Sequence, residues 1–136
     1  IPTINELYII YIYSNTNYMP NINYFIMEDF MPVIEIRENS KEIFNNKDLY
    51  IVDFYASWCN PCKILLPTIE EVGRKENITI YKCNIDDNTE LTKNFHIMSV
   101  PTLVFVKDGK ELKRLSGVHS KDDILTEYYS LRDSEL

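Results

Sequence analysis

The near-continuous apolar run from Leu49 to Tyr55 restricts the possible folds more than any other feature of this sequence. A strand that is apolar at nearly every position is buried on both faces, which is typical of a partly parallel sheet. Such a sheet needs helices on both of its faces, because neither face can be left to water. The run therefore predicts an α/β fold in which residues 49–55 form a buried strand.

The other strands and helices are predicted from local patterns. Strands are expected at residues 33–36, from 78 onward, at 102–106 and at 111–115, with an Asp108-Gly109 turn joining the last two. Helices are expected at residues 39–44, from the cysteine pair to between 73 and 77, at 88–95, and after Ser120. Asn39 or Ser40 is expected to cap the first helix, and Asn39 and Glu42 have the spacing of a capping box. The order βαβαβαββα predicts a central mixed five-stranded sheet with helices on both faces.

Composition restricts the class of protein. With 136 residues, 45% hydrophobic and 26% charged, the chain is expected to form one globular domain with a core of its own. A net charge of −7 disfavours nucleic acid and anionic membranes as main partners, because most of the surface would repel them. Three cysteines are too few for a disulfide scaffold. Proteins or small molecules are the expected partners, and stability is expected to come from packing.

Residues 1–31 differ from the rest and are interpreted as an N-terminal extension to a domain at 32–136. They contain no Lys or Arg and seven of the 17 aromatic residues. Two interpretations stay open: an arm, disordered or packed on the surface, whose composition reflects nucleotide bias, and a segment that docks a partner or associates with a second copy of the chain. The apolar run Leu7 to Tyr13 is too short to span a bilayer. Because residue 1 is not Met, we expect a processed chain in the secretory pathway or an organelle.

Two cysteines, Cys59 and Cys62, follow the buried strand directly. The first turn of the next helix has free N–H groups and the positive end of the helix dipole, which stabilise a thiolate. Side chains three residues apart on a helix lie about 5–6 Å from each other, close to disulfide range. A ring this small adds little stability and opens and closes as a redox couple. Pro61 costs nothing in the first helical turn, where its missing N–H has no partner to lose.

The alternative for this pair is a zinc knuckle, because the same spacing serves metal sites. A zinc site needs two further ligands, and the remaining candidates, Cys83, His96 and His119, are scattered along the sequence. No metal is therefore predicted. Cys83 lies in a predicted strand and is interpreted as a small buried hydrophobic residue, with a regulatory thiol as the alternative. Neither histidine is given a catalytic role.

Two motifs in this order resemble the thioredoxin family. Residues 52–63, VDFYASWCNPCK, are similar to its active-site segment, and residues 98–102, MSVPT, to its second signature loop. The resemblance covers Pro32 to Leu136 and not residues 1–31. It implies a thioredoxin fold and a thiol–disulfide oxidoreductase that reduces protein disulfides with no bound cofactor. It also implies disulfide-containing client proteins and a separate reductase that passes electrons from NADPH to the Cys59–Cys62 disulfide.

The resemblance implies a role for single residues. Cys59 is expected to attack the client disulfide and Cys62 to resolve the mixed disulfide. Asp53 is expected to accept the proton of Cys62, with Lys82 as its partner. Burial within the apolar run also favours a raised pKa for Asp53, the alternative being a salt-bridged or edge-exposed carboxylate.

The resemblance also implies a cis peptide between Val100 and Pro101 beside the cysteine pair; the alternative is an ordinary proline at the start of a strand. Trp58 is expected on a flat surface that binds clients, and its alternative is a place in the core. The residues expected to bind substrate are Trp58, Asn60, Pro61, Val100, Pro101, Gly117 and Val118.

Asn60 departs from the family pattern, which usually has glycine between the cysteines. Its side chain can move the reduction potential in either direction, so disulfide formation or isomerisation stays open as an alternative activity. Pro61 favours the reductase, because a histidine there would stabilise the reduced form. The oxidoreductase is interpreted as a possible part of a larger protein-handling or translocation assembly. A rival from another class is a binding module, in which the domain and residues 1–31 serve mainly as a structural subunit of an assembly.

Overall fold

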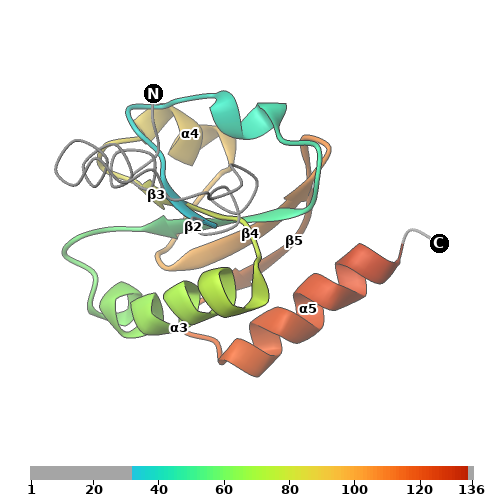
Figure 1. Ribbon diagram of the computed structural model, residues 1–136. Coiled ribbons are helices and arrows are strands. Elements are labelled where there is room, and N and C mark those ends of the chain that lie inside the picture. Colours follow the sequence, from blue (N-terminus) through green and yellow to red (C-terminus); the bar gives the residue numbers. More distant parts are fainter. Residues whose placement is uncertain (1–31, 135–136) are drawn as a thin grey trace, which may run out of the picture.

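A five-stranded mixed sheet lies at the centre of this computed structural model, which describes residues 32–134 (Figure 1). Its strands lie in the order β1-β3-β2-β4-β5. β3 pairs in parallel with β1 and β2, whereas β4 runs antiparallel to β2 and β5. The predicted mixed sheet is confirmed. The strands are β1 Val33–Glu35, β2 Tyr50–Tyr55, β3 Ile80–Asn84, β4 Thr102–Lys107 and β5 Lys110–Ser116.

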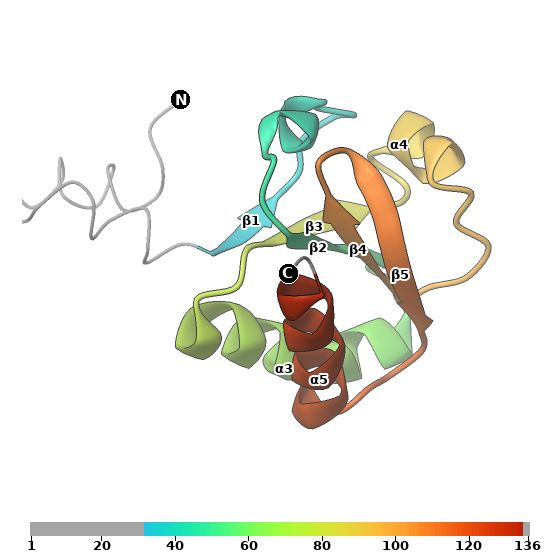
Figure 2. The same ribbon diagram turned by 90° about the vertical axis from the view of Figure 1, so that its right-hand side faces the viewer.

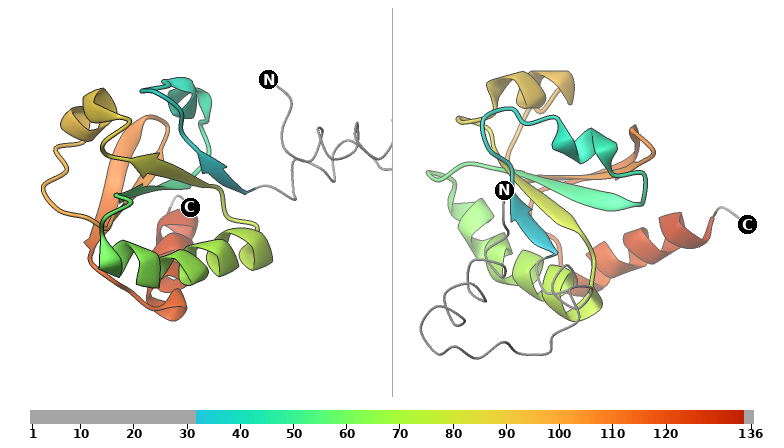
Figure 3. Two further views of the ribbon diagram at one scale, coloured as in Figure 1. Left: turned by 90° about the vertical axis from the view of Figure 1, so that its left-hand side faces the viewer. Right: turned by 45° about the horizontal axis from the view of Figure 1, so that its top comes forward.

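Helices cover both faces of this sheet, as predicted (Figures 1, 2 and 3). The helices α3 (Asn60–Glu76) and α5 (Lys121–Asp133) lie on one face. The 3-10 helix η1 (Glu42–Asn45) and α4 (Thr89–Asn94) lie on the other. Each face has its own apolar core, and β2 supplies both because its side chains alternate: Ile51 packs toward α3, and Tyr50, Val52 and Phe54 pack toward α4.

The first helical segment differs from its prediction. It is a 3-10 helix that begins after Lys41, and the expected capping box between Asn39 and Glu42 is absent from it. Asn39 instead accepts hydrogen bonds from the backbone N–H groups of Glu90 (3.0 Å) and Leu91 (3.3 Å) with its side-chain oxygen. It therefore caps α4, a partner 51 residues away that a local pattern does not reveal.

Two local predictions are confirmed. Asp108 and Gly109 both have positive φ angles, 50° and 76°, the backbone that a tight hairpin between β4 and β5 requires. The hydroxyl of Ser120 accepts a hydrogen bond from the backbone N–H of Asp123 at 3.1 Å and so caps α5. Within residues 32–134, no helix combines the length and apolar character needed to cross a membrane. The predicted extension, residues 1–31, lies outside the described residues.

Candidate active site

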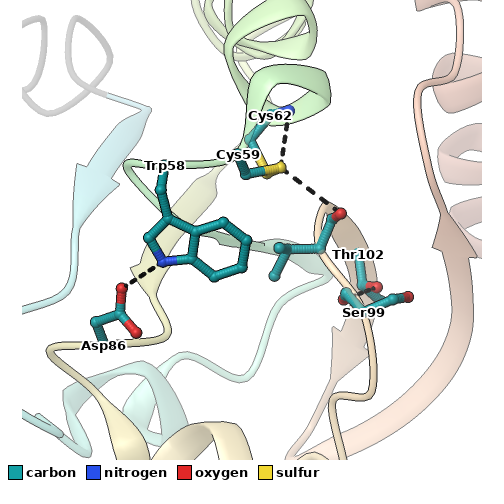
Figure 4. The surroundings of a disulfide bond; sticks show 7 residues. Trp58, Cys59, Cys62, Asp86, Ser99 and Thr102 are labelled. Atoms are coloured by element: carbon teal, nitrogen blue, oxygen red, sulfur yellow. Dashed lines mark hydrogen bonds between the residues drawn. A yellow bond between two sulfur atoms is a disulfide. The ribbon is translucent and has the colours of Figure 1, made fainter.

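The cysteine pair lies where β2 leads into α3 (Figure 4). Cys59 is the N-cap residue of α3 with an extended backbone, and Pro61 occupies the first helical turn, as predicted. Cys59 and Cys62 form a disulfide with their Cα atoms 5.3 Å apart. Their side chains are only 5% and 8% exposed. The fold thus brings both sulfurs together at the start of a helix, just beneath the surface.

The surroundings of Cys59 favour its thiolate form. Its Sγ accepts a hydrogen bond from the backbone N–H of Cys62 at 3.2 Å. That N–H belongs to the first turn of α3, so the helix dipole adds to the stabilisation of negative charge. Ala56, Ile85 and Val100 surround the pair with apolar groups. When the disulfide opens, Cys59 is therefore placed to act as the attacking thiolate.

The loop before β4 lies beside the cysteines (Figure 4). The peptide between Val100 and Pro101 is cis, as predicted. The carbonyl oxygen of Val100 lies 3.7 Å from Cys59 Sγ. Gly117, with a positive φ of 85°, donates its N–H to the carbonyl oxygen of Pro101 at 2.9 Å. Three residues predicted to bind substrate, Val100, Pro101 and Gly117, are thus held next to the redox pair by direct contacts.

An exposed surface surrounds this loop and the cysteines. Trp58 is 66% exposed, so the alternative of a core tryptophan is wrong. Its indole N–H donates to Asp86 Oδ2 at 2.9 Å, which fixes the ring beside the disulfide (Figure 4). Val118 is 49% exposed, and Asn60 and Pro61 are exposed at the start of α3. The structure thus leaves apolar surface uncovered next to the redox pair.

Sequence reasoning missed two residues of this surface. Asp86 lies two residues after the end of β3, and its position after a strand that is parallel to β2 was the available signal. Met98 is 93% exposed and lies two residues before Val100. It belongs to the quoted loop motif, but a methionine alone gives no signal of exposure.

Asp53 lies in the middle of β2 and points toward α3. It is 4% exposed, and its Oδ1 has no hydrogen-bond partner among the described residues. Burial raises its pKa from 3.8 to about 7, while the charge of Lys82 lowers this pKa and that of Glu35 raises it. The predicted raised pKa is confirmed, and the alternative of an edge-exposed carboxylate is wrong.

A pocket of about 140 Å³ connects Asp53 with the redox pair. Both Asp53 and Cys62 line it, together with Lys82. Its volume accommodates several water molecules, and the carboxylate and ammonium provide polar partners for them. Proton transfer between Cys62 and Asp53 through water is therefore geometrically possible. The other lining residues are Tyr55, Ala56, Ser57, Lys63 and Leu66.

Lys82 lies directly opposite Asp53 in the β2–β3 register, which confirms their proximity. Its Nζ is positioned over the ring of Tyr55, 4.3 Å from the ring centroid. The hydroxyl of Tyr55 donates a hydrogen bond to Glu35 Oε1. Sequence reasoning missed both Tyr55 and Glu35, because their contact joins β2 to β1 through β3, a neighbour relation that only the sheet order reveals.

The remaining metal candidates do not join the cysteine pair. Cys83 is fully buried on the face that carries α4, as predicted, and burial raises its pKa to about 12. His96 lies exposed after α4, and His119 contacts the carbonyl oxygen of Ser116 at 2.9 Å. Among the described residues, no group of three or more His, Cys, Asp and Glu side chains is arranged to hold a metal ion.

Comparisons with known proteins agree with this geometry. The family model described as thioredoxin matches residues 31–129. A thioredoxin from Mycobacterium bovis is 38% identical over 88 residues, which are 63% of this chain and 76% of that protein. A bifunctional thioredoxin reductase/thioredoxin from Mycobacterium leprae is 31% identical over 96 residues, covering 68% of this chain and 21% of that protein. A mutant thioredoxin from Halobacterium salinarum superposes with a TM-score of 0.69 at 26% identity, over 74% of this chain and 91% of that one.

Proposed function

The chain belongs to the thioredoxin family and is a thiol–disulfide oxidoreductase, and we propose that it reduces disulfides of client proteins through a Cys59–Cys62 dithiol/disulfide cycle. The observation that carries the proposal is the Cys59–Cys62 disulfide at the N-terminus of α3, next to the Val100–Pro101 loop. In the reduced pair, the N–H of Cys62 would stabilise Cys59 as a thiolate, and Asp53 would be the nearby buried acceptor for the proton of Cys62.

The reaction begins with the reduced pair. The Cys59 thiolate attacks one sulfur of the client disulfide, so a mixed disulfide forms and the other client sulfur leaves as a thiolate. Cys62 then loses its proton to Asp53 and attacks Cys59 Sγ. The mixed disulfide breaks, the second client sulfur leaves as a thiolate that can take the proton back from Asp53, and the pair ends as the disulfide seen here. Two electrons have then passed from the cysteine pair to the client. The reduced pair itself holds these electrons before the reaction, without a bound cofactor.

Asp53 suits the second step because its pKa, near 7, matches the pH at which the reaction would run. A carboxylate with an ordinary pKa near 4 would be too weak a base, and Lys82 alone would push the pKa of Asp53 in that direction. The pocket between Asp53 and Cys62 supplies the path. We assign Lys82 the part of a charged neighbour that limits how far the pKa rises.

Clients are proposed to bind over the exposed surface around the redox pair. Trp58 and Val118 offer apolar contacts, and Asn60 and Pro61 flank the sulfur of Cys59. The backbone of Val100 lies at the position where an extended client segment would pass Cys59. Main-chain pairing of this kind depends little on client sequence, so we expect broad client specificity.

Family membership implies disulfide-containing proteins and a reductase as partners. The Mycobacterium leprae relative combines a thioredoxin reductase with a thioredoxin in one protein, which supports a reductase as electron donor here. We propose that NADPH supplies the electrons through such a separate enzyme. Purified chain should then be reduced by NADPH and a thioredoxin reductase, and not by NADPH alone.

The reduction potential of the Cys59–Cys62 couple tests the direction of the reaction. We expect a value more negative than about −240 mV, within the range of biochemical measurements of the cytosolic glutathione pool. Equilibration with defined dithiothreitol ratios, followed by trapping of free thiols, measures it. A potential near that of strong oxidants, about −120 mV, would indicate a disulfide-forming enzyme instead of a reductase. The higher potential would then be attributed to Asn60. Asn60→Gly is the matched variant.

We also propose, from the composition of residues 1–31, that this segment docks the domain on a larger protein-handling or translocation assembly in the secretory pathway or an organelle. The absence of Lys and Arg from it, against 14 such residues in the whole chain, supports a separate role. Pull-downs with the full chain and with residues 32–136 test it. Identical partner sets for the two chains would refute the docking role. A full chain found only in the cytosol would refute the proposed location.

A further inference from the structure

Three charged side chains form a row across the sheet beneath the start of α3. Lys82 of β3 is the register partner of Glu35 on β1 and also of Asp53 on β2. Register partners in neighbouring strands point to the same face, so the side chain of Lys82 leaves the sheet between those of the two acidic residues. One carboxylate is exposed and the other is buried beside the pocket that reaches Cys62. The row therefore connects the surface to the proposed proton acceptor.

Tyr55 ties the exposed end of this row to the middle. Its hydroxyl donates to Glu35 Oε1, and its ring lies under the ammonium of Lys82 at 4.3 Å from the centroid. A cation over an aromatic face is attracted by the ring, most strongly where water is partly excluded. The hydrogen bond to Glu35 fixes the ring, and the fixed ring holds the ammonium.

We propose that Glu35 is a positioning residue for proton transfer: acting with Tyr55, it engages the charge of Lys82 so that Asp53 stays basic enough to take the proton of Cys62. The inference rests on the proposed role of Asp53. It adds a residue on the edge strand β1 that makes no contact with the sulfurs and acts through Tyr55 and Lys82.

The signs of the charges support this assignment. Lys82 lowers the pKa of Asp53, whereas Glu35 raises it. Of the charged groups near Asp53, Glu35 is the one that carries a negative charge at neutral pH. Its removal leaves the positive charges of Lys82 and Lys63 without this opposing charge. The titratable groups on the same side of the sheet as Asp53 are Glu35 from β1, Tyr55 from β2, Lys82 from β3, and Cys62 and Lys63 from α3, while Cys83 of β3 lies on the opposite face.

The first test titrates Asp53 in the oxidised full-length chain by carbon-13 NMR of the aspartate carboxyl carbons. With the disulfide closed, neither Cys59 nor Cys62 titrates, so the midpoint reports Asp53 without their coupling. Glu35→Gln should lower this midpoint by several tenths of a pH unit, because it removes the charge and keeps the shape. Tyr55→Phe should lower it less, since Glu35 stays but is released. Glu42→Gln, an exposed carboxylate on the opposite side of the sheet, should leave it unchanged.

The second test follows the rate of the Cys62 step. Reduced chain is mixed with an aromatic disulfide whose two halves are coloured thiolates. Attack by Cys59 releases the first half, and attack by Cys62 on the mixed disulfide releases the second. The pH midpoint of the second release should shift downward in Glu35→Gln together with the midpoint of Asp53, and stay at the wild-type value in Glu42→Gln. A purely structural role of Glu35 would change the rate without moving its pH midpoint.

The outcomes separate this inference from the function on which it rests. An unchanged Asp53 midpoint in Glu35→Gln overturns the inference, whatever the role of Asp53. A second release that is as fast in Asp53→Asn as in wild type overturns the proton-acceptor role. Slow release in Asp53→Asn, together with parallel downward shifts of both midpoints in Glu35→Gln, supports both.

Discussion

The two faces of β2 belong to the same buried strand but provide different chemistry. Toward α4, Tyr50, Val52 and Phe54 pack with Cys83 into an apolar core. Toward α3, Asp53 and Tyr55 lie beside a pocket that reaches Cys62. Burial raises a pKa on both faces, that of Cys83 to about 12 and that of Asp53 to about 7. The comparison teaches that burial alone inactivates a group, whereas burial next to a pocket and charged neighbours prepares it for proton transfer.

The largest expected effect comes from replacing cysteines on the two faces of the sheet, Cys59 in the redox pair and Cys83 in the apolar core. Cys59→Ser should lower the catalysed reduction of a protein disulfide by more than about 1000-fold, because the attacking thiolate is lost. Cys83→Ala should leave that rate unchanged, since its thiol is buried on the other face and stays protonated at neutral pH. Turbidity of reduced insulin, with dithiothreitol as the reductant, measures both variants. A comparable loss in Cys83→Ala would show that the two faces are chemically coupled.

A smaller effect concerns stability and Asp53. A pKa raised from 3.8 to about 7 means that the folded chain holds this proton more tightly than the unfolded chain does. The contribution of Asp53 to the free energy of unfolding is therefore fully present below about pH 4 and is lost as the pH rises through 7, by about 4 kcal/mol for a shift of this size. Asp53→Asn should remove this fall. Urea unfolding of the oxidised chain at pH 4 and pH 8 measures it.

The informative quantity is the change between the two pH values, because a buried amide has its own cost at either pH. Parallel pH profiles for wild type and Asp53→Asn would contradict a raised pKa. Asp122→Asn, on the exposed first turn of α5, is the control for the loss of an aspartate.

The smallest expected effect concerns the stability contributed by Tyr50 on the apolar face of β2. The hydroxyl of Tyr50 is buried without a hydrogen-bond partner among residues 32–134, and burial raises its pKa to about 12. Tyr50→Phe should therefore raise the free energy of unfolding by about 1 kcal/mol, because it removes a polar group that has no partner. Tyr81→Phe is the control, since its hydroxyl accepts from Asn46 Nδ2 at 3.3 Å and its loss should be destabilising. Denaturant midpoints distinguish the two, and destabilisation by Tyr50→Phe would indicate an unseen partner.

Features encoded by neighbouring residues could be predicted from the sequence. The Asp108-Gly109 turn, the Ser120 cap and the position of Cys59 at the start of α3 each depend on a few consecutive residues. The cis peptide before Pro101 agreed with an expectation that came from the family resemblance, not from the base rate of such bonds.

Features that depend on distant partners were missed or wrong. Asn39 was assigned to its own segment, whereas the structure shows that it binds the start of α4. The contact of Tyr55 with Glu35 spans 20 residues and requires the order of β1, β3 and β2. Hydrogen bonds of this kind are decided by tertiary packing, which outweighs the local preferences that a sequence pattern reports.

Hydrogen bonds join Asn39 to the start of α4 and form a clasp, so the backbone amides in this corner of the molecule are expected to exchange with solvent together. Asn39 caps Glu90 and Leu91, and the side chain of Asn88 accepts the backbone N–H of Asn39 at 2.7 Å in return. A helix of six residues does not persist alone, so its amides exchange with solvent when the clasp opens. We therefore expect the backbone amides of α4 to exchange at one common rate, which is set by how often the contact with Asn39 opens.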